Sequence, residues 1–221
     1  MEKVRAVVTG ATGMVGEGVL HECLRNEAVE KVLVVGRRAC GVEHAKLREI
    51  IVTDFFDLAP IENELRGWNA CFFCLGVSSL GMSADEYKRL TYDLTMNFAE
   101  TLAMKNPDMT FCYVSGQGTD STEKGRLAWA RVKGKTENDL MKLFPQRAYG
   151  FRIGFLKPEK EYKNTLSFYK FVDWLYPIVR AVTDKYASTL GEVGRAMINA
   201  AAKGYEKPVL EVEDIIELSK R

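Results

Sequence analysis

The stretch VRAVVTGATGMVG, residues 4–16, decides the fold of this chain. It begins with a β-branched apolar run, Val4–Val8, which is typical of a buried strand. Glycines follow at positions 10, 13 and 16, and behind them apolar residues recur at helical spacing as far as Leu24. A strand, a glycine turn and a helix N-terminus in this order predict an anion-binding site, because the free N–H groups and the positive end of the helix dipole face the turn.

The three glycines have different roles in this prediction. Gly10 lets the backbone turn sharply, Gly13 lets it approach a pyrophosphate, and Gly16 lets the helix pack closely on the strand. The strand-turn-helix context distinguishes a dinucleotide fingerprint from a fortuitous glycine turn. We therefore expect a dinucleotide to contact this turn, through Gly10, Thr12, Gly13, Met14, Val15 and Gly16.

Buried strands and amphipathic helices alternate along the rest of the chain. The patterns predict strands at 31–35, 49–53, 70–75, 109–114, 148–153 and 209–212, and helices at 84–105, 126–143 and 192–203. A short terminal helix is expected with Asp214 as its N-cap. Alternation with crossovers of this length predicts an α/β fold with a doubly wound parallel sheet of the Rossmann type. Ligands of such sheets bind beyond the carboxyl ends of the strands.

The totals fit an ordinary globular chain. Its 221 residues, 47% hydrophobic and 28% charged, suit a single domain over residues 1–221. Lys and Arg number 31 against 30 for Asp and Glu, so the chain lacks the basic surface that nucleic-acid binding requires. Charged residues interrupt the longest apolar stretch, near 166–182, which excludes a membrane span there.

Polar and flexible residues follow three of the predicted strands. Arg37 and Arg38 stand where a carboxylate would hold the ribose 2′-hydroxyl of NAD, and a guanidinium pair suits a 2′-phosphate, so NADP(H) is favoured over NAD(H). Either arginine alone also fits a solvated loop charge. Asp54 suits both a contact to the adenine amino group and a turn or cap. Leu75 and Gly76 end the fourth strand, where a glycine lets the cofactor pass close to the backbone.

The cysteines and histidines point to no metal or disulfide. Cys71 and Cys74 form a CxxC within a predicted strand, where positions three apart face opposite sides of the sheet, so core thiols are expected. His21 and His44 lie outside any metal-ligand spacing. Unpaired thiols and the lack of a secretory signal at the N-terminus favour a cytoplasmic location.

The last third of the chain has a different composition. Residues 154–190 are rich in aromatic side chains, and the stretch 165–182 is apolar on almost every side. This pattern predicts a small C-terminal cap over the sheet edge or a homodimer contact through 165–182. Either arrangement is compatible with a wall of the substrate pocket.

Several motifs together resemble the atypical short-chain dehydrogenases/reductases, and in particular the bacterial epimerase-like and the Tat-interacting oxidoreductase-like proteins. They are TGATGMVG at 9–16, the arginine pair, the Leu75-Gly76 turn, YVSG at 113–116 and WARVKGKTEN at 129–138. The similarity extends from Val4 to about Gly204. It implies an NAD(P)-binding Rossmann fold and a catalytic set of Ser, Tyr and Lys, with Tyr four residues before Lys.

The resemblance places Ser115 and Lys133 in that set but replaces its tyrosine with Trp129. Ser115 is then expected to orient the substrate oxygen and Lys133 to hold the ribose. Trp129 is expected to pack against the nicotinamide or line the pocket, or else to polarise the substrate as a hydrogen-bond donor. It is no general acid or base, because an indole N–H donates without ionising. A turn serine and a solvated lysine are the structural alternatives.

Two functions follow, with a third ranked last. The first is an NADP(H)-dependent oxidoreductase acting on a small carbonyl or alcohol compound, with water or one of Tyr92, Tyr113 and Tyr162 as the proton source. The second is a non-catalytic NADPH-binding redox sensor or regulator, because Trp129 breaks the proton relay. A nucleotide-sugar epimerase needs the same tyrosine and a larger C-terminal domain than the chain offers after Ile153.

Overall fold

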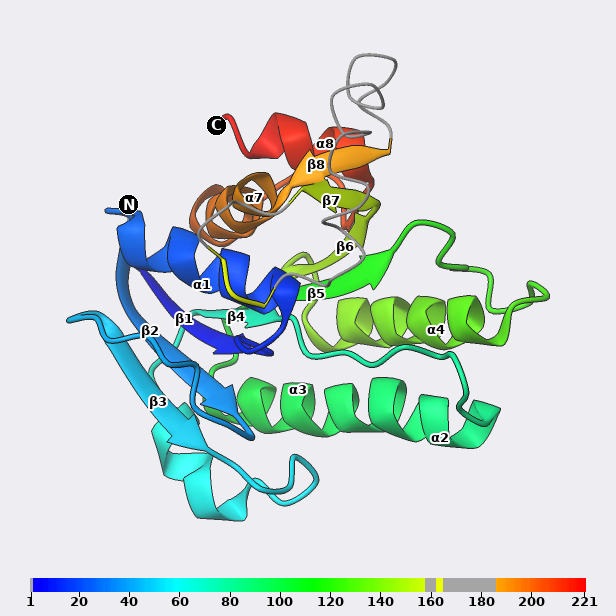
Figure 1. The fold of residues 1–221 in the computed structure, drawn as a ribbon, viewed down its shortest axis with the longest axis horizontal. Coiled ribbons are helices and arrows are strands. Elements are labelled where there is room, and N and C mark those ends of the chain that lie inside the picture. The colour runs from blue at the N-terminus through cyan, green and yellow to red at the C-terminus, as the bar shows by residue number, and fades with distance from the viewer. Residues whose placement is uncertain (1, 158–161, 165–185) are drawn as a thin grey trace.

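Seven parallel strands form one sheet in the order β3-β2-β1-β4-β5-β6-β9, which confirms the predicted doubly wound arrangement (Figure 1). The computed structural model describes residues 2–157, 162–164 and 186–221. The chain crosses to the other half of the sheet after β3, so the strand order reverses between the neighbours β1 and β4, and such a switch point is where these sheets bind ligands. The strands are β1 (Val4–Thr9), β2 (Val29–Gly36), β3 (Leu47–Ile51), β4 (Ala70–Phe73), β5 (Thr110–Gly116), β6 (Ala148–Ile153) and β9 (Val209–Leu210).

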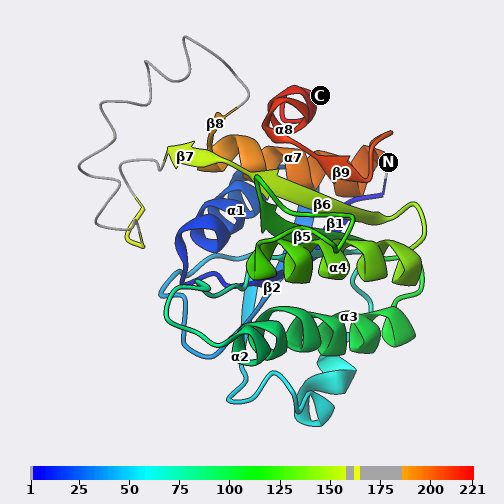
Figure 2. The same cartoon turned by 90° about the vertical axis from the view of Figure 1, so that its right-hand side faces the viewer.

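Helices cover both faces of the sheet (Figures 1 and 2). One face carries α1 (Met14–Arg25), α7 (Leu190–Lys203) and α8 (Val212–Leu218). The other carries the 3-10 turn η1 (Ala59–Leu65), α2 (Ala84–Lys88), the π-helical turn η2 (Arg89–Asp93), α3 (Leu94–Lys105) and α4 (Ala128–Leu143). Two apolar cores result, because successive strand residues such as Val7 and Val8 point to opposite faces.

The cysteines behave as core thiols, as the alternation predicts. Cys71 lies in the core beneath α3, whereas Cys74 packs against the core beneath α1. Burial raises the pKa of Cys71 well above its ordinary value and that of Cys74 to about 12. All five cysteines are free thiols, and the described residues contain no group of His, Cys, Asp and Glu able to hold a metal ion.

Several boundaries differ from the sequence-based expectation. The third strand begins and ends two residues earlier, at Leu47–Ile51, and the predicted helix 84–105 is interrupted by η2. The N-cap of α8 is Glu211 rather than Asp214. Asp214 is instead the third helical residue, and its carboxylate accepts the N–H of Glu211 at 3.1 Å, because the two acids form a reciprocal capping box.

A small second sheet, which the sequence did not predict, pairs β7 (Phe155–Lys157) with β8 (Ala187–Thr189) in parallel. The predicted aromatic cap falls largely on residues 158–161 and 165–185, and the predicted dimer contact falls on 165–182; both lie outside the described residues. Within the described ranges, no helix is long and apolar enough to cross a bilayer.

Candidate functional site

The glycine turn is held tightly between the end of β4 and the start of α1. Gly10 has φ +71°, and a Cβ on it would lie 2.6 Å from the carbonyl oxygen of Cys74. A Cβ on Gly16 would lie 2.1 Å from the carbonyl oxygen of Gly10. Gly13 donates its N–H to that same oxygen at 2.9 Å. The predicted sharp turn and close helix packing are therefore present.

The N-terminus of α1 is open to an anion. The N-cap residue of the helix is Gly13, and within the described structure no side chain caps it. Thr12, Gly13, Met14 and Val15 are partly exposed or exposed, whereas Gly16 is buried against the turn. Backbone N–H groups at such a helix start suit a pyrophosphate, so the donor chemistry of this turn fits a dinucleotide.

A cavity of about 250 Å³ lies beside the turn, beyond the ends of β2, β3 and β4. It brings together four of the predicted cofactor residues, Arg37, Asp54, Leu75 and Gly76. Arg38 is exposed and is not part of the described lining. The arrangement connects the cavity to the glycine turn, because the N–H of Leu75 donates to Thr9 Oγ1 at 3.3 Å.

The charged side chains at this cavity differ in whether they already have a hydrogen-bond or ion-pair partner. Asp54 Oδ1 accepts the N–H of Phe56 at 2.8 Å, so Asp54 forms the turn that was one of its two interpretations. A contact to adenine through its other carboxylate oxygen stays a prediction. Arg37 and Arg38 form no ion pair with any described residue. Their guanidinium groups are exposed at the end of β2, where an anion can reach them.

Further along the same edge, Ser115 is buried and its hydroxyl is already engaged. Its Oγ donates to Glu137 Oε1 at 2.5 Å. Glu137 is almost fully buried on α4 and pairs through Oε2 with Arg152 Nη2 at 2.7 Å. Arg152 lies beside Ser115 in the β5–β6 register and also contacts Ser121 and Glu211. Ser115 is therefore the end of a buried polar network.

Lys133 projects from α4 toward the end of β5. Its Nζ donates to the carbonyl oxygen of Val114 at 3.3 Å and lies 5.5 Å from the ring centroid of Tyr113. Burial lowers the pKa of Lys133 to about 8, although Glu137, one turn further along the helix, opposes the shift. The lysine is thus close to Ser115 in the fold, as the family pattern implies.

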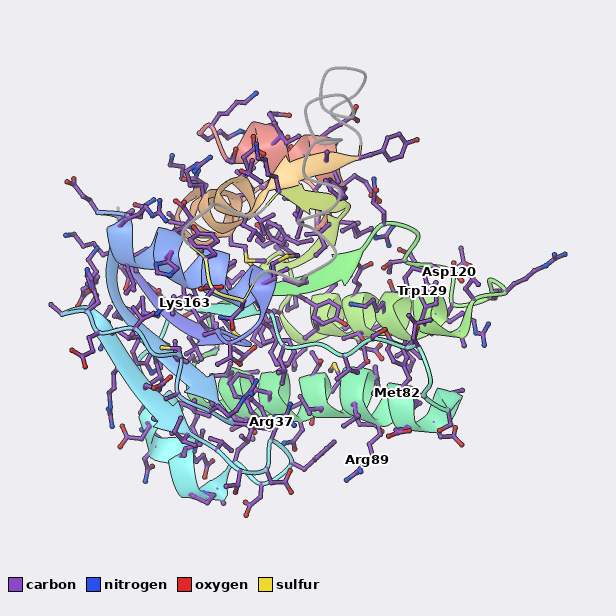
Figure 3. The ribbon with its side chains drawn as sticks, viewed as in Figure 1. Arg37, Met82, Arg89, Asp120, Trp129 and Lys163 are labelled. Atoms are coloured by element: carbon purple, nitrogen blue, oxygen red, sulfur yellow. The ribbon has the colours of Figure 1, made fainter. Side chains whose placement is uncertain are left out.

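Trp129 occupies the first turn of α4 and packs against the loop that follows β5 (Figure 3). Its ring approaches within 3.5 Å of where a Cβ on Gly118 would stand, and Gly118 has φ +84°. Asp120 shapes the same loop by accepting the N–H of Gly125 at 2.6 Å. These contacts place the ring against the loop, and its contact to a nicotinamide stays a prediction.

The three tyrosines considered as substitute acids have other contacts. Tyr92 donates its hydroxyl to Asp139 Oδ2 at 2.8 Å between η2 and α4. Tyr113 is buried beneath Lys133. Tyr162 stacks on His21 with the ring centroids 5.0 Å apart. None of these contacts places a tyrosine hydroxyl beside Ser115.

Sequence reasoning missed three residues of this edge. Glu137 could have been found, because it follows Lys133 by four positions and so shares its helix face. Arg152 could have been found only with the β5–β6 register known. Arg89 lines the 250 Å³ cavity, but it lies within a predicted helix, and no sequence motif marks it as a binding residue.

The fold and the glycine turn define a protein with an NAD(P)-binding Rossmann domain. Residues 6–135 match the model of the NAD dependent epimerase/dehydratase family. This match covers more than half of the chain, so the chain belongs to that family. The resemblance inferred from the motifs is confirmed.

Curated relatives and solved structures agree with this placement. "Protein FMP52-1, mitochondrial" of Scheffersomyces stipitis is 28% identical, over 98% of this chain and 99% of its own length. "Protein HTATIP2" of Rattus norvegicus is 28% identical, over 73% of this chain and 66% of its own. The fold is shared with Helicobacter pylori ADP-L-glycero-D-manno-heptose-6-epimerase, at TM-score 0.70 and 15% identity, over 99% of this chain and 82% of that one. It is also shared with Bordetella bronchiseptica WbmF in complex with NAD+, at TM-score 0.69 and 15% identity, over 99% of this chain and 77% of that one.

The expected cytoplasmic location is wrong by the same comparison. Relatives from Scheffersomyces stipitis, Emericella nidulans and Meyerozyma guilliermondii all carry the word mitochondrial in their names. Unpaired thiols do not indicate the compartment here, because buried thiols such as Cys71 are inert in any of them. A secretory signal reports only on export and carries no information on transport into mitochondria.

Proposed function

We propose that this chain binds NADP(H) along the carboxyl edge of its sheet and uses it as an oxidoreductase on a small carbonyl or alcohol compound. The observation that carries the proposal is the cavity of about 250 Å³ that gathers Arg37, Asp54, Leu75 and Gly76 next to the glycine turn. We name this cavity the adenosine end of the site. Ser115, Trp129 and Lys133 form the nicotinamide end.

The preference for NADP(H) rests on charge. Arg37 lines the adenosine end without an ion-pair partner among the described residues, and Arg38 extends the cationic rim. A guanidinium group binds a phosphate with two hydrogen bonds, whereas the neutral ribose of NAD gains little from it. Asp54 is in the same lining, and its hydrogen bond from Phe56 leaves one oxygen for the adenine amino group.

The proposed chemistry assigns each residue of the nicotinamide end a separate task. Bound NADPH supplies a hydride to the substrate carbon. Lys133 holds the ribose, Ser115 orients the substrate oxygen once its hydroxyl turns away from Glu137, and Trp129 forms a wall of the pocket. Because Trp129 does not ionise, we assign the proton on the product oxygen to water.

A second function is favoured by one feature of the nicotinamide end. The hydroxyl of Ser115 donates to Glu137 at 2.5 Å and Trp129 stands where the family pattern has its tyrosine, so the residue that we assign to orient the substrate is bound to the protein itself. This feature supports a protein that binds NADPH as a redox sensor or regulator without turnover. We place this function second because the family is one of NAD-dependent enzymes.

The test separates binding from turnover. NADPH and NADH are titrated against the protein, and binding is followed by the fluorescence of the reduced nicotinamide. We expect saturable binding that is tighter for NADPH, and a loss of that preference in Arg37→Ala. Aldehydes, ketones and quinones are then screened by loss of nicotinamide absorbance; binding without oxidation of NADPH by any of them favours the regulator, and no binding rejects both functions.

A further inference from the structure

The helical segment that follows the β4 loop is not uniform. Between α2 and α3 lies the π-helical turn η2, Arg89–Asp93. Such turns insert an extra residue into a helix, reorient the side chains around it, and are frequent at functional sites. Both Arg89 and Leu90, at the start of this turn, line the cavity of the adenosine end.

The contacts of Arg89 differ from those of its neighbour. Lys88 forms an ordinary surface ion pair with Asp93 at 2.8 Å. Arg89 forms no ion pair with any described residue, and its guanidinium carbon lies 4.8 Å from the ring centroid of Phe56. Stacking on an aromatic face holds a guanidinium in place and leaves its N–H edge free for an anion.

Two arginines without an ion-pair partner among the described residues therefore line one cavity. Arg37 comes from the end of β2 and Arg89 from η2, and Figure 3 shows both at the same side of the molecule. The carboxylate in the same lining, Asp54, already accepts a backbone N–H. Two guanidinium groups in one lining favour an anion there, and because the pyrophosphate is expected at the glycine turn, the 2′-phosphate is the anionic group of NADP(H) left for this cavity.

We propose that Arg89 is a specificity-determining residue that binds the adenosine 2′-phosphate together with Arg37. This inference rests on the proposed NADP(H) function and adds to it a residue from a different element. Phe56 is its positioning residue, because the ring supports the guanidinium.

The experiment measures equilibrium binding of NADPH and NADH to the full chain carrying Arg89→Ala, with Lys88→Ala as the matched control. A charge-assisted hydrogen bond to phosphate predicts that Arg89→Ala weakens NADPH about tenfold to a hundredfold. NADH is expected to change less than about threefold, and Lys88→Ala to change neither. Arg89→Lys should recover part of the loss, because an ammonium keeps the charge without the two-pronged geometry.

Adenosine 2′,5′-bisphosphate and AMP serve as competing probes without a nicotinamide. We expect Arg89→Ala to weaken the bisphosphate and to leave AMP unchanged. Equal weakening of NADPH and NADH would assign Arg89 to the adenine ring and overturn the inference, and so would no change in either. A wild-type protein that does not prefer NADPH overturns the NADP(H) proposal as well, whereas a preference that Arg37→Ala removes and Arg89→Ala leaves intact overturns only the role of Arg89.

Discussion

The two ends of the candidate site use their charges in opposite ways. At the adenosine end, Arg37 and Arg89 line a cavity and pair with no described residue. At the nicotinamide end, Ser115, Glu137 and Arg152 satisfy one another in a buried network. The cations of the first end are therefore accessible to an anion, whereas the charges of the second end are matched within the protein.

This difference separates what the protein binds from what it does to it. Unpaired cations at an open cavity favour an anionic ligand whatever the chemistry that follows. Catalysis requires groups whose hydrogen bonds are free to change in the reaction. The structure therefore supports the binding of an anionic ligand more directly than turnover, and variants at each end separate the two.

The largest effect is expected at the nicotinamide end, from Glu137→Ala. The carboxylate is fully buried, and its removal leaves the hydroxyl of Ser115 without its partner and the guanidinium of Arg152 with only Ser121 and the half-exposed Glu211. Breaking a buried pair in this way costs about 3–5 kcal/mol of unfolding free energy. Urea denaturation followed by circular dichroism measures it.

The control for this loss is Glu211→Ala. Glu211 also pairs with Arg152, at 3.2 Å, but its side chain is 48% exposed and it caps α8. Losing an exposed pair and a cap together costs about 1–2 kcal/mol. Equal losses in the two variants would contradict the view that the network of Ser115 depends on the buried acid.

The glycine turn between the two ends gives the next effect. In Gly10→Ala the new Cβ meets the Cys74 carbonyl at 2.6 Å and the residue keeps a positive φ. We expect a loss of about 2–4 kcal/mol in unfolding free energy and of most NADPH affinity. Gly41 has the same φ of +71° with nothing within 4 Å, so Gly41→Ala should lose only the strain of about 1 kcal/mol. Similar losses of unfolding free energy in Gly10→Ala and Gly41→Ala would show that the positive φ, and not the contact with Cys74, causes the loss.

How much of the fold and the site could be predicted from the sequence depends on how far apart in the chain the interacting residues lie. The sheet, its helices and the glycine turn were predictable because their signals are local: periodic apolar residues, and glycines at fixed spacing after a strand. The strand ends placed Arg37 and Asp54 at one edge, and the structure brings them into one cavity. Their meeting follows from parallel topology alone.

The remaining features depend on contacts between distant segments. Arg89 enters the site through a π-helical turn, which helical periodicity does not reveal. Arg152 meets Ser115 through the β5–β6 register, and whether Ser115 faces a substrate or Glu137 is decided by packing. The replacement of tyrosine by Trp129 was visible in the sequence, but the loop against which it packs was not.

A smaller effect concerns the charge of Lys133. Burial lowers its pKa from 10.5 to about 8, so the folded protein binds the proton less tightly than the unfolded chain. The burial penalty is complete below pH 8 and is relieved as the pH rises from about 8 to 10.5, so stability should rise in that window. Between pH 7 and pH 10, the unfolding free energy of the wild type should rise by about 2 kcal/mol more than that of Lys133→Met, after allowance for partial exposure of the lysine. Unfolding free energies at pH 7 and 10 measure it, and a constant difference between the two proteins would contradict it.

The smallest effect on stability, and the most informative one on function, is expected from Trp129→Tyr. Trp129 packs against the Gly118 loop at the surface of α4, so a smaller aromatic ring should cost no more than about 1 kcal/mol. The new hydroxyl stands one helical turn before Lys133, whose positive charge favours the ionised tyrosine.

If oxidation of NADPH by a carbonyl compound appears only in the variant, the wild-type nicotinamide end binds without turnover. If the wild type is active and the variant loses activity, Trp129 shapes a working pocket and the proton has a source other than position 129. Trp129→Phe is the control, because it removes the indole without adding a hydroxyl, and a gain of activity there would rule out the phenol as the cause.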